Sequence, residues 1–160
     1  MDYIASLLRL IAALNDAKVD YIVIGGAALN LHGLVRATED VDLFVAPTSE
    51  NIERLKIALR AVWNDPHIDE ISHEDLCGDY PAVRYGPPEG NLYLDILTRL
   101  GEATRYDDLE AETIKVRDTA VRVATPMTLY RMKKDTVRAI DRADAQVLKD
   151  AFEIEDPDAD

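Results

Sequence analysis

Two aspartates in a short apolar stretch are the residues of this chain best suited to chemistry. Asp40 and Asp42 flank Val41 and precede Leu43-Phe44-Val45, a run of aliphatic and aromatic residues typical of a strand. Because alternate residues of a strand face the same side, both carboxylates are expected on one face. Two carboxylates about 4 Å apart repel each other by roughly 4 kcal/mol at an effective dielectric near 20. The pair therefore predicts a bound cation or a shared proton.

A third aspartate lies far along the chain in similar surroundings. Asp95 interrupts the apolar run Leu92–Thr98, where strand preference disfavours an aspartate. Mg²⁺ prefers oxygen ligands, and it commonly uses one or two carboxylates together with the phosphates of a substrate. Together with Asp40 and Asp42, Asp95 would complete a site for two metal ions, which is typical of enzymes that act on phosphate groups.

A diglycine lies shortly before the first two aspartates. Tyr21–Ile24 predicts a short buried strand, and Gly25 and Gly26 end it, because glycine allows a sharp turn and a close approach to its backbone. Ala27–Gly33 predicts a short helix with Gly33 as its C-cap. Backbone N–H groups at the start of a helix favour phosphate, so the diglycine is a candidate phosphate-binding turn.

Helices are predicted on both sides of these motifs. Apolar residues at helical spacing predict a packing helix over residues 2–16, and a second one that begins with Thr48 or Ser49 as N-cap and runs to Trp63. Thr125-Pro126 is a typical helix start, and the residues after it predict one broken helix or two, over Met127–Lys134 and Thr136–Lys149.

Further strands are predicted as antiparallel pairs. Ala82–Tyr85 and Leu92–Leu97 flank a turn rich in glycine and proline, and Thr113–Val116 and Ala120–Val123 flank a short polar turn. The first pair would carry Asp95 into the sheet. Residues 64–80 are expected to be irregular, and residues 101–112 are expected to be loop or short helix.

Length and composition limit the class of protein. The chain has 160 residues, a formal net charge of −13 and a single cysteine, Cys77. We expect one domain over residues 1–160, with the acidic residues 153–160 as a frayed tail. The charge disfavours tight nonspecific binding to nucleic acid, but it is compatible with a local basic patch or a basic protein partner.

The compartment is predicted from the same data. No apolar run approaches the roughly 20 residues that a membrane helix needs, so we expect no membrane segment and no signal peptide. A single cysteine excludes an internal disulfide framework and fits a reducing cytoplasm. The expected location is therefore cytoplasmic, and the sequence makes no prediction of oligomeric state.

Taken together, the motifs resemble a known family. Gly25-Gly26, then Thr38-Glu-Asp-Val-Asp42 and the strand-borne Asp95, are similar to the nucleotidyltransferase fold of the DNA polymerase β superfamily, and within it to AbiEii-type toxin nucleotidyltransferases. The C-terminal helical segment of that family is matched by Met132-Lys133, Arg138, Asp141 and Asp144. The resemblance spans most of residues 20–148. It implies an α/β (α+β) fold with a mixed, mostly antiparallel sheet flanked by helices, and with C-terminal helices.

The resemblance also implies an activity. The chain would be a Mg²⁺-dependent nucleotidyltransferase that moves a nucleoside monophosphate from an NTP to an acceptor hydroxyl. The catalytic and metal-binding residues, for two Mg²⁺ ions, would be Asp40, Asp42 and Asp95. The nucleotide-binding residues would be Gly25, Gly26, Arg36, Thr38 and Lys133. RNA such as tRNA is an implied acceptor, and a separately encoded antitoxin is an implied protein partner.

Two alternatives remain open. Adenylylation of a small hydroxylated molecule, as in aminoglycoside-modifying relatives, fits the acidic charge, because a cationic substrate would be attracted. A catalytically silent module that binds a nucleotide or a partner protein fits Ala27, which follows the diglycine where many active relatives carry a serine.

Overall fold

A six-stranded mixed sheet forms the centre of the computed structural model, which describes residues 2–34, 40–79, 81–89, 92–100, 104–134 and 139–156. Its strands, in the order β3-β4-β2-β1-β8-β7, are β1 (Tyr21–Ile24), β2 (Asp40–Val45), β3 (Ala82–Tyr85), β4 (Tyr93–Leu97), β7 (Ala111–Val116) and β8 (Thr119–Ala124). The pairs β1–β8 and β2–β4 are parallel, and the other three are antiparallel. The expected mixed, mostly antiparallel sheet is therefore confirmed.

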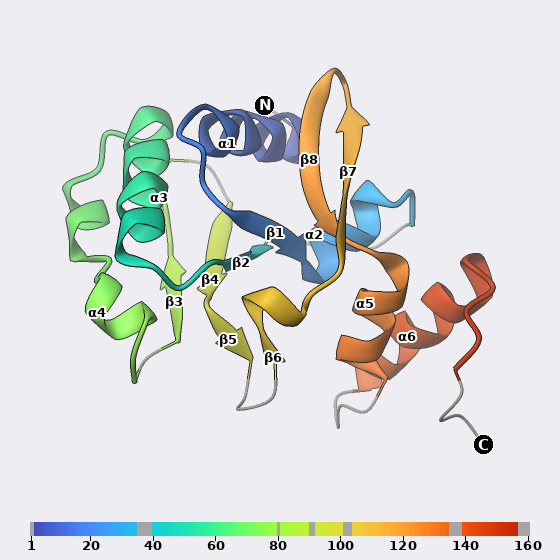
Figure 1. The fold of residues 1–160 in the computed structure, drawn as a ribbon. Coiled ribbons are helices and arrows are strands. Elements are labelled where there is room, and N and C mark those ends of the chain that lie inside the picture. Colours follow the sequence, from blue (N-terminus) through green and yellow to red (C-terminus); the bar gives the residue numbers. More distant parts are fainter. Residues whose placement is uncertain are drawn as a thin grey trace.

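Helices pack around this sheet. They are α1 (Tyr3–Asp16), α2 (Gly25–Leu31), α3 (Ser49–Val62), α4 (His73–Leu76), α5 (Pro126–Lys133) and α6 (Ala139–Ala151), together with the 3₁₀ helices η1 (Pro66–Glu70) and η2 (Tyr106–Asp108). Figure 1 shows α3 and α4 at one end of the molecule and α5 with α6 at the other. No helix in the described part of the chain is both long and apolar enough to cross a membrane.

Local sequence signals place the starts of α3 and α5 correctly. The Thr48 hydroxyl accepts a hydrogen bond from the backbone N–H of Asn51, and the Thr125 hydroxyl accepts one from the N–H of Thr128. Each hydroxyl thus satisfies a donor that the first helical turn leaves without a partner. The region after Thr125, which the sequence left as one helix or two, forms α5 and α6 as separate helices.

Packing in the core explains why buried and partly exposed residues alternate along β2 and β4. On β2 and β4 the fully buried residues Val41, Leu43, Leu94 and Ile96 belong to one apolar cluster with side chains of α1 and α3. The residues between them, Asp42 and Asp95, are only partly buried. Burial of one face therefore sets the register of these strands and leaves the aspartates on the other face.

Three segments differ from the sequence-based expectations. The diglycine is not a turn ahead of a helix at Ala27, because α2 itself begins at Gly25 and ends at Leu31. In residues 101–112, expected to be loop or short helix, Tyr106–Asp108 form the short helix η2, but Thr104–Arg105 form the strand β6, which pairs antiparallel with β5 (Arg99–Leu100). Residues 101–103 lie outside the described residues. Strands of two residues are too short to produce an alternating pattern.

The acidic tail is the third difference. Ile154 is buried, and the carboxylate of Asp156 accepts hydrogen bonds from the Tyr130 hydroxyl and from Lys134 Nζ, each at 2.9 Å. Residues 153–156 of the tail that the sequence predicted to be frayed therefore pack against α5, and residues 157–160 lie outside the described residues.

Candidate active site

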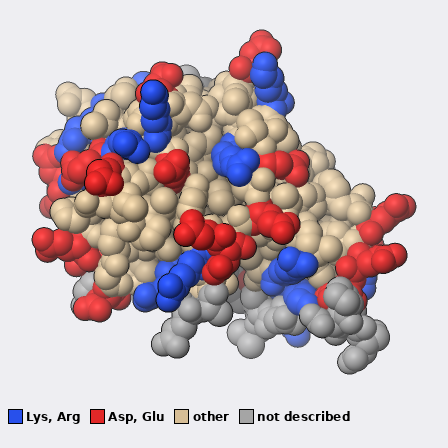
Figure 2. Space-filling view, viewed as in Figure 1, with Lys and Arg blue, Asp and Glu red and all other residues tan. Residues whose placement is uncertain are grey.

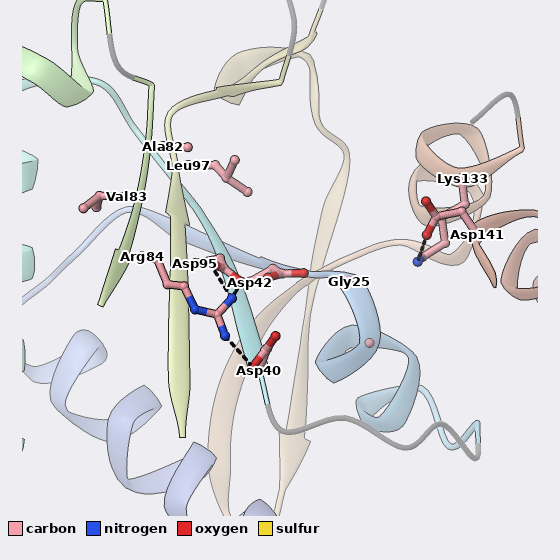
Figure 3. Close-up of a pocket in the computed structure, with 11 residues that line it drawn as sticks. Gly25, Asp40, Asp42, Ala82, Val83, Arg84, Asp95, Leu97, Lys133 and Asp141 are labelled. Carbon is pink, nitrogen blue, oxygen red and sulfur yellow. Dashed lines mark hydrogen bonds and ion pairs between the residues drawn. The ribbon is translucent and has the colours of Figure 1, made fainter. Parts of the chain in front are cut away.

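Strands β2 and β4 place three aspartates at one pocket. The parallel register pairs Asp42 directly with Asp95, and Asp40 lies two residues earlier on β2. The three side chains line a pocket of about 570 Å³, together with Gly25 and Gly26 of α2. Figure 3 shows the Asp42 and Asp95 carboxylates close together and Asp40 below them. The tertiary fold thus brings together residues more than 50 positions apart in the chain, beside the diglycine.

Gly25 makes room for the Asp42 carboxylate. Its φ of +67° lies in the left-handed region, and a Cβ built at this position would lie 2.2 Å from Asp42 Oδ2. The carboxylate therefore packs directly on the glycine backbone, at a distance that no side chain at residue 25 allows. Ala27, which follows the diglycine, is fully buried.

Asp42 is the electrostatically unusual group of the pocket. Its burial, followed by the proximity of the Asp95 carboxylate, raises the pKa of Asp42 to about 7, and a hydrogen bond from Asp42 to Asp95 contributes to the shift. Below about pH 7, and without a cation in the pocket, Asp42 is therefore protonated and donates a hydrogen bond to the Asp95 carboxylate. The sequence predicted a shared proton or a cation for Asp40 and Asp42, whereas the carboxylate that most affects the pKa of Asp42 is that of Asp95.

The raised pKa predicts an unusual pH dependence of stability. In the unfolded chain Asp42 releases its proton near pH 4, whereas the folded protein keeps it up to about pH 7. The folded state therefore binds the extra proton between these values, and without divalent cations its stability should fall as the pH rises from 5 to 7. Urea unfolding at these pH values measures the slope. In Asp42→Asn, which has no proton to lose, we expect the decrease to disappear, and an unchanged slope would contradict the assignment.

Arg84 is the site residue that the sequence analysis missed. From β3 its guanidinium reaches Asp40 Oδ1 at 3.3 Å and Asp95 Oδ2 at 3.4 Å, and it also lies over the Tyr93 ring at 4.9 Å. The side chain is about half exposed, and its contacts to both carboxylates are long. The register of the β3–β4 pair, which places Arg84 directly opposite Asp95, was the signal that could have identified it. Opposite charges at directly paired positions of two strands attract each other.

Lys133 lies across the pocket from the aspartates, on α5 (Figure 3). Its ammonium lies 3.0 Å from Asp144 Oδ2 and 3.3 Å from Asp141 Oδ1, both on α6, and only 11% of its side chain is exposed. Lys133 on α5 therefore pairs with Asp141 and Asp144 on α6, across two helices. Arg138 lies outside the described residues.

This arrangement predicts a structural effect of Lys133. In Lys133→Met the ammonium is lost and two partly enclosed carboxylates remain, which should lower the free energy of unfolding by about 3 kcal/mol. Chemical denaturation measures this change. Lys115→Met, on exposed β7, is the matched control and should stay within about 0.5 kcal/mol of the wild type. Equal stability of the two variants would show that the buried pairing contributes little.

Arg36 and Thr38 lie outside the described residues. Among the described residues, no three acidic, histidine or cysteine side chains are gathered closely enough to form a ready-made metal centre. In the pocket itself, Arg84 contacts two of the three carboxylates.

Comparison with protein families identifies a match over most of the chain. The model of the family described as "Nucleotidyl transferase AbiEii toxin, Type IV TA system" matches residues 7–152. Among curated protein sequences, none matches this chain.

Several solved structures have a similar fold over most of this chain. ANT(2″)-Ia in complex with adenylyl-2″-tobramycin aligns with a TM-score of 0.53 at 12% identity, over 91% of this chain and 87% of that one. A protein of Thermotoga maritima assigned as a nucleotidyltransferase aligns with a TM-score of 0.54 at 13% identity, over 94% and 92% of the two chains. JHP933 from Helicobacter pylori aligns with a TM-score of 0.56 at 21% identity, over 94% and 66%. At these identities the likeness establishes the fold alone.

Proposed function

Because the chain belongs to the nucleotidyl transferase AbiEii toxin family of type IV toxin–antitoxin systems, we propose that its pocket moves a nucleoside monophosphate from a nucleoside triphosphate to an acceptor hydroxyl. The observation that carries the proposal is the pairing of Asp42 with Asp95 on adjacent parallel strands. The pocket volume of about 570 Å³ suits a nucleotide, since small-molecule sites commonly enclose about 300–1,000 Å³.

The donor set fits Mg²⁺. The pKa of Asp42 is raised because its carboxyl group is buried and faces Asp95, and a divalent cation bound there would favour the charged carboxylate. Asp42 and Asp95 would hold the ion, and Asp40 would join them after release from Arg84. When bound, Mg²⁺ would offset the charge of the phosphates and lower the pKa of the acceptor hydroxyl. The two ions expected from the sequence would need all three carboxylates.

The side chains of the pocket would perform the remaining steps. The acceptor oxygen forms a bond to the α-phosphorus while the bond to the pyrophosphate oxygen breaks, and Asp95 would accept the hydroxyl proton. Gly25 and Gly26 leave one wall without side chains, so phosphates can approach the backbone there. Lys133, held by Asp141 and Asp144, would stabilise the negative charge of the departing pyrophosphate.

Arg84 is suited to a role that changes on substrate binding. Its long contacts to Asp40 and Asp95 and its half-exposed side chain leave it free to turn toward solvent. We expect it to leave the carboxylates when phosphates enter and to pair with phosphate oxygens, for which the guanidinium is geometrically suited. The Arg84 side chain would thus offset charge both in the empty and in the occupied pocket.

Two versions of this function differ in the molecule that accepts the nucleotide. RNA, the acceptor that the sequence resemblance implies, is the first candidate, and the description of the family as a type IV toxin–antitoxin toxin implies an antitoxin as partner. A small cationic acceptor is the second candidate, because four carboxylates line the pocket and ANT(2″)-Ia, a structural neighbour, was solved with adenylyl-2″-tobramycin. The net charge of −13 favours the cation at long range.

A direct assay tests the proposal. Each of the four NTPs, labelled at the α-phosphate, is incubated with the protein, Mg²⁺ and either total tRNA or an aminoglycoside. We expect Mg²⁺-dependent label in one acceptor, and its loss in Asp95→Asn. Transfer that survives this substitution would contradict the assignment of Asp95, and absence of NTP binding in calorimetry would favour a silent binding module.

A further inference from the structure

A second, smaller pocket lies beside the candidate active site. It has a volume of about 190 Å³ and is lined by Pro47, Leu76, Cys77, Gly78, Pro81, Thr98, Arg99 and Arg105. The two pockets adjoin along the chain, because Leu97 and Ala82 line the first, whereas Thr98 and Pro81 line the second. At about 30 Å³ per water molecule, this volume has room for roughly six waters or one tetrahedral oxyanion.

Two arginines face this pocket from β5 and β6. Arg99 and Arg105 are direct partners in the antiparallel register, so their side chains leave the strands on the same face. Like charges directly opposite each other in a strand pair are unfavourable. No carboxylate lines the pocket, and neither guanidinium has an ion pair within the described part of the chain.

A buried donor in this pocket is a second observation that points to a ligand. Arg99 Nε is buried, and it is the one buried side-chain nitrogen or oxygen of the described residues without a hydrogen-bond partner. Buried polar groups nearly always have a partner in folded proteins, and a charged donor without one is especially unfavourable. An oxyanion between Arg99 and Arg105 would satisfy this donor and offset the repulsion between the two charges.

The wall of the pocket is held in place by hydrogen bonds. The Thr98 hydroxyl donates to the Leu76 carbonyl, and the Thr98 N–H donates to the Pro81 carbonyl at 2.9 Å. The N–H groups of Cys77 and Gly78 donate to carbonyls of α4. Figure 2 shows Lys and Arg side chains gathered at the lower edge of the molecule, in the region where Figure 1 places β5 and β6. A local basic site therefore exists on a strongly acidic chain.

We propose that Arg99 and Arg105 bind a phosphate group, and that this phosphate belongs to the acceptor of the transfer reaction. The second part rests on the proposed function, and it makes the acceptor a nucleic acid rather than a cationic small molecule. A planar guanidinium suits phosphate, because it donates two parallel hydrogen bonds to two oxygens. A phosphodiester held at Arg99 would lie next to the pocket where the acceptor hydroxyl must react.

Cys77 provides a test that needs no catalysis. It is the single cysteine of the chain, it is exposed, and it lines the same pocket. Its alkylation by iodoacetamide, a neutral reagent, is followed with inorganic phosphate or with chloride at equal ionic strength. Bound phosphate should slow the reaction by roughly the factor 1 + [phosphate]/Kd. Equal rates in the two salts would overturn the proposal, and this measurement uses only the wild-type protein.

Variants connect the protection to the two arginines. In Arg99→Gln and Arg105→Gln, phosphate should bind roughly tenfold more weakly, because each variant loses charge-assisted hydrogen bonds. Arg117→Gln, at the tip of the β7–β8 hairpin, removes the same charge elsewhere and should keep full protection. Asp42→Asn should also keep it, so failure of the catalytic proposal and failure of this one are distinguishable. Protection that persists in both arginine variants would place the phosphate elsewhere.

Two further ligands distinguish a phosphate group of the acceptor from one of the nucleoside triphosphate. A short single-stranded oligoribonucleotide and ATP without divalent cations are compared at equal concentration of phosphate groups. Stronger protection by the oligoribonucleotide, with a salt dependence that weakens in Arg99→Gln, is the expected result. Protection by ATP or inorganic phosphate without any protection by the oligoribonucleotide would overturn the assignment to the acceptor.

Discussion

Asp42→Asn should lower nucleotidyl transfer by about a thousandfold or more while the protein remains folded. The substitution keeps the shape of the side chain but removes the negative charge that faces Asp95. Because the raised pKa of about 7 already keeps Asp42 largely protonated below neutral pH, a neutral side chain fits this position without a loss of stability. Initial rates with labelled NTP measure the loss, and circular dichroism on heating measures the fold.

The control for this substitution is another aspartate. Asp16→Asn, at the exposed end of α1, removes the same charge far from the pocket and should leave the rate within about twofold of the wild type. If Asp42→Asn kept more than about a tenth of the wild-type rate, Asp42 would not be a metal ligand and the mechanism would need another charge at this position.

Gly25→Ala should lower transfer by about a hundredfold or more, because the new Cβ would lie 2.2 Å from Asp42 Oδ2 and would displace that carboxylate. Gly33 offers a matched control. It also has a positive φ, of +88°, but no atom lies within 4 Å of a Cβ built there. Both alanine variants should therefore lose about 1–2 kcal/mol of stability through backbone strain, and only Gly25→Ala should lose activity as well.

A double variant separates the steric overlap with the Asp42 carboxylate from the backbone strain at residue 25. Combining Gly25→Ala with Asp42→Ala removes the carboxylate that the new Cβ would meet, so part of the stability lost in Gly25→Ala should return. Urea unfolding of the two single variants and the double variant gives the coupling energy. Strict additivity of the two changes would show that Gly25 and Asp42 do not interact in this way.

The local sequence predicted the elements that carry the site. Alternation on β2 placed Asp40 and Asp42 on one face, because the intervening Val41 is driven into the core. Thr48 and Thr125 predicted their helix starts, because a hydroxyl at the N-cap satisfies a backbone donor within three residues. Both are short-range effects, and a single stretch of sequence contains all the atoms involved.

The sequence predicted the start of α2 at Ala27, two residues after its position in the structure. Glycine has a low helix propensity, so Gly25 and Gly26 predicted a turn ahead of the helix. The structure begins α2 at Gly25, where the packing of Asp42 from β2 admits only hydrogen at the α-carbon. A contact between two segments thus decided a boundary that local propensity could not.

By itself, the sequence predicted the six strands of the central sheet, the N-caps Thr48 and Thr125 and the strand-borne aspartates, because periodicity and capping act between neighbours in the chain. Only the tertiary structure decided that Arg84 contacts Asp40 and Asp95, that Lys133 is held by Asp141 and Asp144, and that Arg99 faces Arg105. Each of these arrangements depends on strand register or helix packing between separate segments. Register and packing follow from the burial of the whole core, which no single stretch of the chain specifies.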